Sequence, residues 1–547
     1  MYAGLRWVSA LSAPSLAIAM NWTSPYPSHR TPTLARNTVT TTQPLAAQAG
    51  LRVLQAGGNA VDAALAAAIT LTVVEPIMNG IGGDLYAMVW DQGRLHGLNA
   101  TGAAPAAWNP ERFAGLAQMP RNGWDAVTVP GQVSGWRALS ERFGRLPFAR
   151  LFESAIDYAD NGFAVSPFIA SVWPLLADLV RGQPGFDAAF LRAGRAPVAG
   201  EWWRFPDQAR TLADIAATGG DSFYRGALAE RIAAHARATG GALTEADLAA
   251  QQPQWVTPVA QRYRGLTLHE IPPNGQGIAA LMALGMLEHF DMREAGLDTA
   301  AAAHLQIEAM KLAFADLHAH VADPAHMQCT TAQLLDLDYL ARRARLIDPH
   351  RAQAPTPGAP KSGGTVYLAA ADANGMMVSL IQSNYYAFGS GVVVPGTGIA
   401  LHNRGWNFSL EPGHPNQVAP GKRPLHTIIP GFVTDSAGEP LMAFGVMGGF
   451  MQAQGHVQML SRLADFGQAP QAMNDAPRFM VSPVDHSVKL ETHMPEAVAQ
   501  GLQERGHAVQ ALPTGHLDFG AAQIVQRAQG YYVAASDGRR DGQAVGY

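Results

Sequence analysis

The feature that most constrains the fold is an abrupt change in the character of the chain near residue 364. Residues 352–364 are rich in proline and glycine, a composition typical of an exposed linker. Two strand-forming runs, 365–371 and 376–383, follow it and are joined by Asp372-Ala373-Asn374-Gly375. Because Asn-Gly is the strongest short signal of a β-hairpin, the pattern predicts that a strand begins at Thr365, directly after a flexible segment.

The chain ahead of this linker begins with two predicted helices and a hairpin. Residues 43–75 have the character of two helices, one at 44–55 and one from Ala60 onward, and Gly57-Gly58 between them suits the end of the first helix. A glycine-rich loop then leads into two predicted strands, at 85–90 and 94–98. Because this loop precedes a strand, it differs from the strand-to-helix loop that binds dinucleotides.

A long helix is predicted at 301–321, where apolar residues share one face and Asp323-Pro324 ends the element. Further strands are predicted at 398–402, 427–433, 441–445 and 522–533. No repeat of fixed period is visible, which excludes solenoids and propellers. Helices packed outside two sheets are the simplest architecture for this mixture.

Charge and composition narrow the classes of partner. The 547-residue chain has 38 Lys+Arg and 43 Asp+Glu, a net charge of −5, and no basic tract. It therefore lacks the electrostatic footprint of a nucleic-acid binder, and we expect a small-molecule substrate. The longest apolar run, 63–74, is shorter than the roughly 20 residues of a spanning helix, so no membrane span is expected. The single cysteine, Cys329, cannot form an internal disulfide.

The N-terminal extension, residues 1–34, has two interpretations. Residues 1–19 carry one positive charge, Arg6, and an apolar run ending in Ala17-Ile18-Ala19, which weakly imitates a secretory signal. Alternatively, Met20 is the true start of the protein, and residues 1–19 come from sequence upstream of that start. The expected location is cytoplasmic under the second interpretation and periplasmic under the first.

Thr365 has one special chemical possibility. If the Gly364–Thr365 bond is cut, the residue carries both a hydroxyl nucleophile and a free α-amine. An α-amine has an unperturbed pKa of about 7.7 to 8.0, so a useful fraction is neutral near pH 7 and takes the hydroxyl proton. Taken alone this is thin evidence, because threonines open many strands.

Nine short motifs, in order along the chain, make the sequence resemble the γ-glutamyltranspeptidase family of N-terminal-nucleophile hydrolases. They are Gly57-Gly58-Asn59-Ala60-Val61-Asp62-Ala63, Gly80-Ile81-Gly82-Gly83-Asp84, Val129-Pro130-Gly131, Glu308-Ala309-Met310-Lys311, Gly364-Thr365, Phe388-Gly389-Ser390-Gly391, Lys422-Arg423-Pro424, Gly448-Gly449 and Asn474-Asp475-Ala476-Pro477-Arg478-Phe479. The resemblance implies an α+β fold, a four-layer αββα sandwich. It also implies a precursor that cuts itself into a large subunit, 35–364, and a small subunit, 365–547.

The resemblance assigns roles to four residues. Thr365 becomes the nucleophile, and the Gly364–Thr365 bond becomes the cleavage site. Gly448 and Gly449 would supply the backbone N–H groups that hold the tetrahedral oxyanion, although a plain turn is the alternative. Ser383 matches a hydroxyl that supports the nucleophile's amine, although a serine in a strand is most often an ordinary surface residue.

Two departures from the family pattern concern charge. Family members that act on glutathione hold the substrate α-carboxylate with an Arg, and the corresponding position here is Thr101. The Gln and Asp that bind the substrate amine fall on Arg404 and Asn407, so the carboxylate that would pair with an ammonium has become a neutral amide. Losing one charge-assisted hydrogen bond of about 1.5–3 kcal/mol should lower the preference for an α-amino acyl group by roughly 10- to 150-fold.

The remaining departures are substitutions of polar groups. The usual Ser-Ser pair after Lys-Arg-Pro-Leu is His426-Thr427 here. A family Asn falls on Tyr385, although Asn384 is adjacent if the register shifts by one. We therefore treat His426, Thr427 and Tyr385 as candidate substrate-binding residues together with Arg404, Asn407 and Thr101.

These differences favour an acyl group with a free carboxylate and no α-amine, because Arg404 places a planar carboxylate-binding group near the expected ammonium position. Family branches acting on oxamate or glutaryl-cephalosporins are the nearest analogies. The alternatives are that Arg404 bonds loop carbonyls, that the protein performs conventional γ-glutamyl transfer or glutathione hydrolysis with rearranged contacts, or that it is an unprocessed, non-catalytic homologue.

No cofactor is expected, because amide acyl transfer needs none. No histidine or cysteine pair shows metal-ligand spacing in the sequence, and His318 and His320, two apart on a helix, point in different directions. The partners expected are a small-molecule amide and the two subunits of one precursor. A dimer of the two-subunit unit is one expected assembly, which the sequence leaves open.

Overall fold

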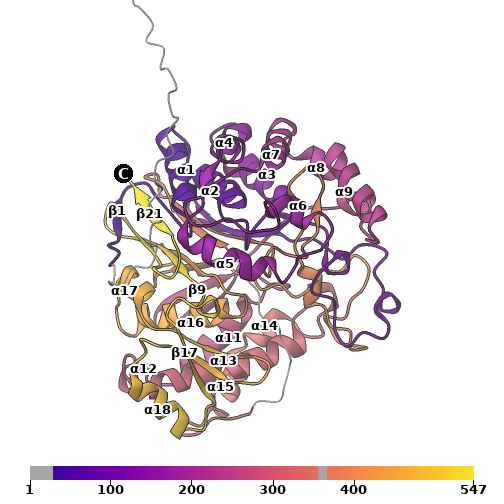
Figure 1. Cartoon of the computed structure of the whole chain (residues 1–547). Helices are drawn as coiled ribbons and strands as arrows, with labels where there is room; N and C mark the ends of the chain where they lie inside the picture. The colour runs from indigo at the N-terminus through magenta and orange to yellow at the C-terminus, as the bar shows by residue number, and fades with distance from the viewer. Residues whose placement is uncertain (1–28, 355–365) are drawn as a thin grey trace, which may run out of the picture.

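A computed structural model describes residues 29–354 and 366–547. Two seven-stranded sheets lie face to face, and helices cover the outer face of each (Figure 1). This is the predicted four-layer αββα sandwich. We name the sheets after a central strand of each, the β10 sheet and the β15 sheet.

The β10 sheet contains, in spatial order, β21 (Gln543–Gly546), β2 (Thr38–Thr41), β10 (Val366–Ala371), β11 (Met377–Ser383), β3 (Asp84–Asp91), β4 (Arg94–Ala100) and β7 (Gln254–Val256). The β15 sheet contains β1 (Thr33–Ala35), β20 (Tyr532–Ser536), β19 (Ala522–Arg527), β15 (Pro440–Val446), β14 (Gly431–Thr434), β9 (Leu266–Glu270) and β8 (Val259–Tyr263). Smaller sheets pair β5 (Phe163–Ala164) with β6 (Trp202–Trp203) and β12 (Val393–Val394) with β13 (Ile399–Ala400). In a third small sheet, β17 (Val488–Glu491) lies between β16 (Phe479–Val481) and β18 (Val509–Leu512).

Each helical layer comes from a separate stretch of chain. The layer over the β10 sheet has α1 (Pro44–Gln55), α2 (Ala60–Val74), α3 (Gln132–Phe143), α4 (Glu153–Asn161), α5 (Pro167–Ala177), α6 (Phe186–Phe190), α7 (Pro206–Thr218), α8 (Asp221–Arg225), α9 (Ala227–Ala238) and α10 (Glu245–Ala249). The layer over the β15 sheet has α11 (Gly277–Leu287), α12 (Met292–Ala295), α13 (Ala300–His320), α14 (Thr331–Leu334), α15 (Leu337–Ala344), α16 (Met451–Ala464), α17 (Pro470–Asp475) and α18 (Glu496–Glu504).

Strand β10 lies at the centre of the sandwich, and all six of its residues are buried. Val366, Leu368 and Ala370 belong to the core shared with the first helical layer, whereas Tyr367, Ala369 and Ala371 face the β15 sheet. Successive side chains of a strand point to opposite faces, so both faces of β10 must be apolar. This explains why the run after the linker is continuously hydrophobic.

The segments before and after the linker share both sheets. Strand β10 pairs with β2 on one side and with β11 on the other, and β11 pairs with β3. The predicted large and small subunits would therefore alternate within one sheet. Their boundaries at 364 and 365 lie outside the described residues and remain a prediction.

Several element predictions are confirmed, and others need correction. The helices at 44–55, 60–74 and 301–321 and both hairpins form as expected, from Val366 onward in the second. The predicted strand at 427–433 is β14 only from Gly431, because Thr427 is held by a side chain of the site. The predicted strand at 522–533 is two strands, β19 and β20, because the chain reverses at Gly530, whose φ is +82°. The strand at 398–402 shortens to β13.

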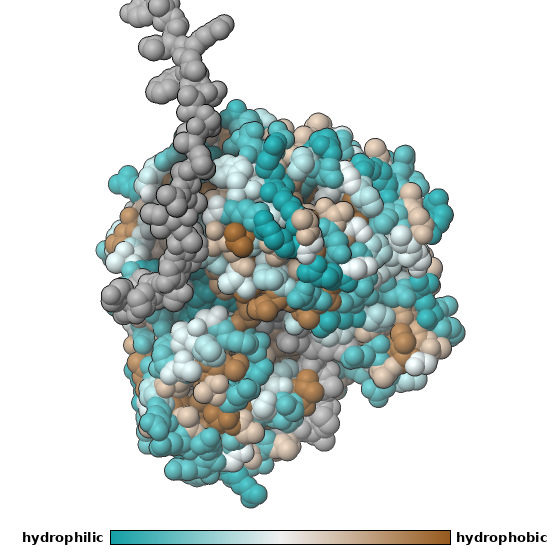
Figure 2. Space-filling view, viewed as in Figure 1, coloured by the Kyte–Doolittle hydropathy of each residue, from teal (hydrophilic) through white to brown (hydrophobic). Residues whose placement is uncertain are grey.

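The described residues, 29–354 and 366–547, include no helix that combines the length and apolar character needed to cross a membrane. Figure 2 shows that hydrophilic side chains dominate the face in view, with apolar ones in small groups between them.

The end of α2 buries a carboxyl group whose titration we expect to affect stability. Glu75 is 1% exposed, and Thr42 Oγ1 donates a hydrogen bond to its Oε2 over 2.5 Å. Burial raises the pKa of Glu75 to about 7 from its ordinary value near 4.5. Between these values the folded protein binds a proton that the unfolded chain has released. The resulting stabilisation is fully present below about pH 4.5 and is lost as the pH rises through about 7.

We therefore predict that Glu75→Gln flattens the pH dependence of stability. As the pH rises from 4.5 to above 7, the free energy of unfolding of the wild type should fall by about 3 kcal/mol more than that of the variant. Chemical unfolding at pH 5, 6, 7 and 8 measures this difference, with the exposed Glu504→Gln as control. The same pH profile for wild type and Glu75→Gln would contradict the prediction.

Candidate active site

The candidate site lies at one end of the β10 sheet. Val366, the first residue of β10, is opposite Gln382, and Ser383 at the end of β11 is opposite Asp84, the first residue of β3. The chain therefore enters β10 at the end of the sheet where Ser383 and Asp84 lie. Gly364 and Thr365, the predicted cleavage site and nucleophile, lie outside the described residues.

Four predicted site residues meet beyond the end of β11. The main-chain N–H of Tyr385 donates to Ser383 Oγ over 2.7 Å, and its φ of +78° turns the chain sharply. The Arg404 guanidinium stacks over the Tyr385 ring, 4.2 Å from its centroid. The Tyr385 hydroxyl donates to Asn407 Oδ1 over 2.5 Å. Arg404 and Asn407 lie at the two ends of one short 3-10 turn, which places both against the same ring.

Arg404 is completely buried, but its guanidinium is only partly hydrogen-bonded. Nη1 donates to Thr427 Oγ1 over 2.8 Å. Nε and Nη2 make no hydrogen bond to the described residues. These two nitrogens form one edge of the planar group, the edge that binds a carboxylate through two parallel hydrogen bonds. Burial lowers the pKa of Arg404 to about 10, opposed by Asp84, so the group is a cation at neutral pH.

Asp84 lies beside this cation and organises the neighbouring loops. Its Oδ1 accepts the N–H groups of Gly102 and Gly131, over 3.3 and 3.0 Å. Its Oδ2 accepts a hydrogen bond from His426 Nε2 over 3.1 Å. Burial raises the pKa of Asp84 to about 7, opposed first by Arg404.

Both histidines of the site are held neutral. The Nδ1 of His426 accepts the Ile428 N–H, which leaves the proton on Nε2. His402 accepts the Arg404 N–H at Nδ1 and donates from Nε2 to the Thr128 carbonyl, over 3.2 and 3.1 Å. Burial, reinforced by Arg404, lowers the pKa of His402 to about 3 and that of His426 well below its ordinary value. Arg404 is therefore the cation of this group of residues.

The predicted oxyanion glycines form the turn before α16. Gly448 and Gly449 have φ values of +120° and +63°, which favour glycine. Neither N–H donates a hydrogen bond to the described residues. Gln276 Nε2 donates to the carbonyls of Thr427 and Gly449, over 2.5 and 2.8 Å. The Gln276 amide thus links Thr427, the partner of Arg404, to the glycine turn. The N–H groups of Gly448 and Gly449 in this turn are of the kind that stabilise an oxyanion.

Two other predicted substrate-binding residues use their polar groups within the protein. The Thr101 hydroxyl donates to Asn99 Oδ1 over 2.7 Å. The Asn407 side chain accepts from Tyr385 and donates from Nδ2 to the Leu425 carbonyl over 2.9 Å. Thr101 and Asn407 therefore form part of the wall of the candidate site, whereas Arg404 offers hydrogen-bond donors that no described residue uses.

The sequence analysis assigned no role to several residues that the structure brings to the site. Asp84, His402 and Gln276 are far apart in the chain and meet only in the folded protein. Asn384 entered only as a register alternative; it is buried, and its amide atoms lack partners among the described residues. A Cβ placed on Gly80 would lie 2.7 Å from Asn384 Nδ2, so the glycine loop makes room for this side chain.

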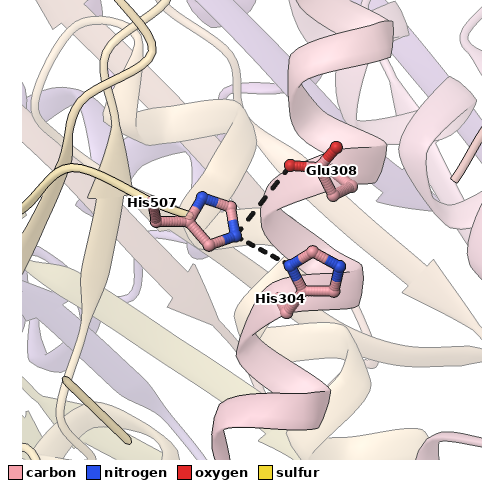
Figure 3. Close-up of side chains that lie close together, drawn as sticks. All are labelled: His304, Glu308 and His507. Atoms are coloured by element: carbon pink, nitrogen blue, oxygen red, sulfur yellow. Dashed lines mark hydrogen bonds and ion pairs between the residues drawn. The ribbon is translucent and has the colours of Figure 1, made fainter. Parts of the chain in front are cut away.

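One group of side chains outside the site could in principle hold a metal ion. His304, Glu308 and His507 converge within 4.8 Å (Figure 3), although His304 and His507 are 203 residues apart, which spacing in the sequence could not reveal. Lys311 Nζ already binds Glu308 Oε1 over 2.7 Å, and both side chains are buried. A second cation there would be repelled by this ammonium. The group also holds the chain before the linker, because Glu308 Oε2 accepts the Gln353 N–H over 3.0 Å.

The stacked sheets, the two helical layers and the site at the end of β11 define an N-terminal-nucleophile hydrolase fold. The solved cephalosporin acylase from Bacillus halodurans shares it, with a TM-score of 0.92 and 46% identity, covering 97% of this chain and 99% of that one. The family model "Gamma-glutamyltranspeptidase" matches residues 46–547, and the chain belongs to this family of enzymes.

Two curated relatives resemble the chain over nearly its whole length. The oxamate amidohydrolase proenzyme of Klebsiella pneumoniae is 38% identical over 515 residues, 92% of this chain and 97% of the relative. The glutathione hydrolase-like YwrD proenzyme of Bacillus subtilis is 36% identical over 510 residues, with the same coverage. The relatives thus include amidohydrolases, acylases and glutathione hydrolases.

We predict that Thr427 stabilises the buried Arg404. Thr427→Val removes the oxygen that accepts from Nη1 and should lower the free energy of unfolding by about 1.5–3 kcal/mol. Thr427→Ser keeps that oxygen and should cost clearly less. Chemical unfolding of the two variants side by side measures the difference, and equal losses would show that the hydroxyl does not support Arg404.

Proposed function

We propose that the protein is an autoprocessing amidohydrolase or acyltransferase that acts on amides of carboxyl-bearing acyl groups without an α-amine. The acyl group would pass through an ester with Thr365. Oxamate and glutaryl amides represent the substrate class. The observation that carries the proposal is the free, buried edge of the Arg404 guanidinium.

The charge of this edge argues for a carboxylate. A buried cation with unsatisfied donors is costly, and an ionised carboxylate on Nε and Nη2 would add opposite charge and satisfy both donors. An ammonium in the same place would be repelled. Asn407 holds the position of the family's ammonium-binding Asp, but it is neutral and its amide is already hydrogen-bonded. An α-amino acyl group would therefore find no partner.

The similarities support the same substrate class. An oxamate amidohydrolase and a cephalosporin acylase are among the relatives that match this chain over most of its length. Glutathione hydrolases also match, at lower identity, which keeps γ-glutamyl transfer as the second candidate. An unprocessed, non-catalytic homologue is the third.

The proposed reaction follows the chemistry of an N-terminal threonine. The free α-amine of Thr365 accepts the hydroxyl proton as Oγ attacks the amide carbonyl, and the N–H groups of Gly448 and Gly449 would hold the oxyanion. The C–N bond then breaks, the amine leaves with the proton, and an acyl ester remains. Water, activated by the same α-amine, attacks the ester and releases the carboxylic acid. An amine in place of water gives transfer.

The same hydroxyl would first cut the precursor. Thr365 Oγ attacks the Gly364 carbonyl, and the peptide bond becomes an ester as the nitrogen takes up a proton. Hydrolysis of this ester leaves a carboxylate on Gly364 and a free α-amine on Thr365. The cleavage by the nucleophile would thus also create its base.

Cleavage is the first testable consequence. The 58.0 kDa chain should yield fragments of roughly 39 and 19 kDa, in proportion to 364 and 183 of its 547 residues. N-terminal sequencing of the smaller fragment should read Thr-Val-Tyr-Leu. Thr365→Ala should remain uncut and inactive, whereas the nearby Ser362→Ala should cleave normally. A different N-terminus, or cleavage of Thr365→Ala, would sink the assignment.

Substrate charge is the second consequence. Arg404→Gln should lower kcat/KM on glutaryl anilide by about 10- to 100-fold, the effect of one charge-assisted contact. Valeryl anilide has the same chain length without the carboxylate, and its hydrolysis should change little. Arg404→Lys keeps the charge but not the two-donor edge, and we expect an intermediate loss.

Both measurements require protein shown to be fully cleaved. The wild type should also prefer glutaryl over γ-glutamyl anilide by at least about tenfold, because the ammonium lacks a partner. Equal losses on glutaryl and valeryl anilide would mean that Arg404 does not bind the substrate's carboxylate. A preference for γ-glutamyl anilide would favour the second candidate.

A further inference from the structure

A second arginine lines a cavity beside the site. The cavity has a volume of about 560 Å³ and lies between β7, the end of β4, the turn before α11 and the loop after α13. We call it the Arg423 pocket; its lining includes Arg423, Asn99, Asn274, Asp323, Gln328 and Cys329. Gln328 is exposed, so the cavity meets the surface, whereas Arg404 is completely buried.

Arg423 is fixed at its base and free at its tip. Its Nε donates to the Thr101 carbonyl and its main-chain N–H to Asp323 Oδ2, both over 3.0 Å. Its Nη1 and Nη2 make no hydrogen bond or ion pair with residues 29–354 or 366–547. The neighbouring Lys422, by contrast, uses its ammonium on the carbonyls of Pro415 and Gln417.

Arg423 is also the sole lysine or arginine among the lining residues. The one carboxylate among them, Asp323, accepts main-chain N–H groups from Ala325 at Oδ1 and from Arg423 at Oδ2. The pocket therefore offers a positioned cation whose terminal nitrogens are unpaired. A carboxylate is one of the anionic groups whose geometry matches that of a guanidinium.

The pocket and the candidate site share a wall. The Asn274 carbonyl accepts the His426 N–H over 2.7 Å, and the Asn274 side chain accepts from Tyr86 and Asn99. Thr101, which Arg423 holds, precedes Gly102, which donates to Asp84. Arg404 and Arg423 both lower the pKa of Asp84, so both charges act on the same carboxyl group.

We propose that the Arg423 pocket receives the amine half of the substrate and that Arg423 binds a carboxylate on that half. This inference rests on the proposed function. Arg404, being buried, would hold the acyl end, and the leaving amine must then lie on the side that opens to solvent. The substrate class becomes an amide with a carboxylate at both ends, such as a dicarboxylic acid joined to an amino acid or an aminobenzoate.

A matched pair of substrates tests Arg423. Glutaryl anilide and glutaryl 4-carboxyanilide differ by one carboxylate on the leaving amine. Arg423→Gln should lower kcat/KM on the carboxyanilide by about 10- to 100-fold and on the anilide by less than about threefold. Arg423→Lys should recover part of the loss. Because Nε also holds Thr101, equal losses on both substrates would show a structural role and overturn the proposal.

The single cysteine provides an independent probe, because Cys329 lines the pocket and is half-buried. Burial raises the pKa of its thiol, so labelling with a bulky maleimide is carried out at alkaline pH. 4-Aminobenzoate should slow this labelling in the wild type but not in Arg423→Gln, and aniline should have no effect. The labelled enzyme should lose more activity on the carboxyanilide than on the anilide, with Cys329→Ser unaffected.

These outcomes separate the two proposals. If the cleaved enzyme hydrolyses neither glutaryl substrate, the proposed function is refuted. Protection of Cys329 by 4-aminobenzoate would still report binding in the pocket. Hydrolysis of both substrates without protection of Cys329, and without selective loss in Arg423→Gln, would refute the pocket's role alone.

Discussion

The site depends on one buried cation that the protein only partly satisfies. Arg404 is enclosed completely, yet among the described residues its side chain has one hydrogen-bond partner, the Thr427 hydroxyl, and one stacking partner, the Tyr385 ring. Burying a charge is costly unless it is paired, so this arrangement prepares the site for an anion. In this account the substrate's carboxylate completes the structure, and binding and selectivity have the same physical origin.

The residues around Arg404 leave it as the cation of this group. His402 and His426 are fixed as neutral rings by main-chain groups, and Asp84 is held by two backbone N–H groups at the start of β3. Gln276 connects the Arg404 side to the glycine turn before α16. Such a set of groups can be rigid because the central strands of the β10 sheet are covered on both faces. The sandwich thus supplies position, and in the proposed function a few substituted side chains supply specificity.

Local signals predicted much of the fold. Asn374-Gly375 marked the central hairpin, and Gly57-Gly58 marked the end of α1. The strand at 427–433 starts only at Gly431, because a side chain, Gln276, bonds the Thr427 carbonyl and an isolated bridge, not a ladder, holds the preceding His426. Family motifs indicated the predicted site residues, and the substitution at Arg404 suggested the charge of the substrate. The Arg404–Thr427 and Asp84–His426 contacts could not be predicted, because they join residues tens to hundreds of positions apart. The edge of Arg404 that these contacts leave free could therefore not be predicted either.

The most direct measurement is a crystal structure of the cleaved enzyme with glutarate bound. We predict that one carboxylate of the ligand binds Nε and Nη2 of Arg404 through two hydrogen bonds of about 2.7–2.9 Å. A structure in which these nitrogens bind protein groups, with the ligand's carboxylate held elsewhere, would contradict it.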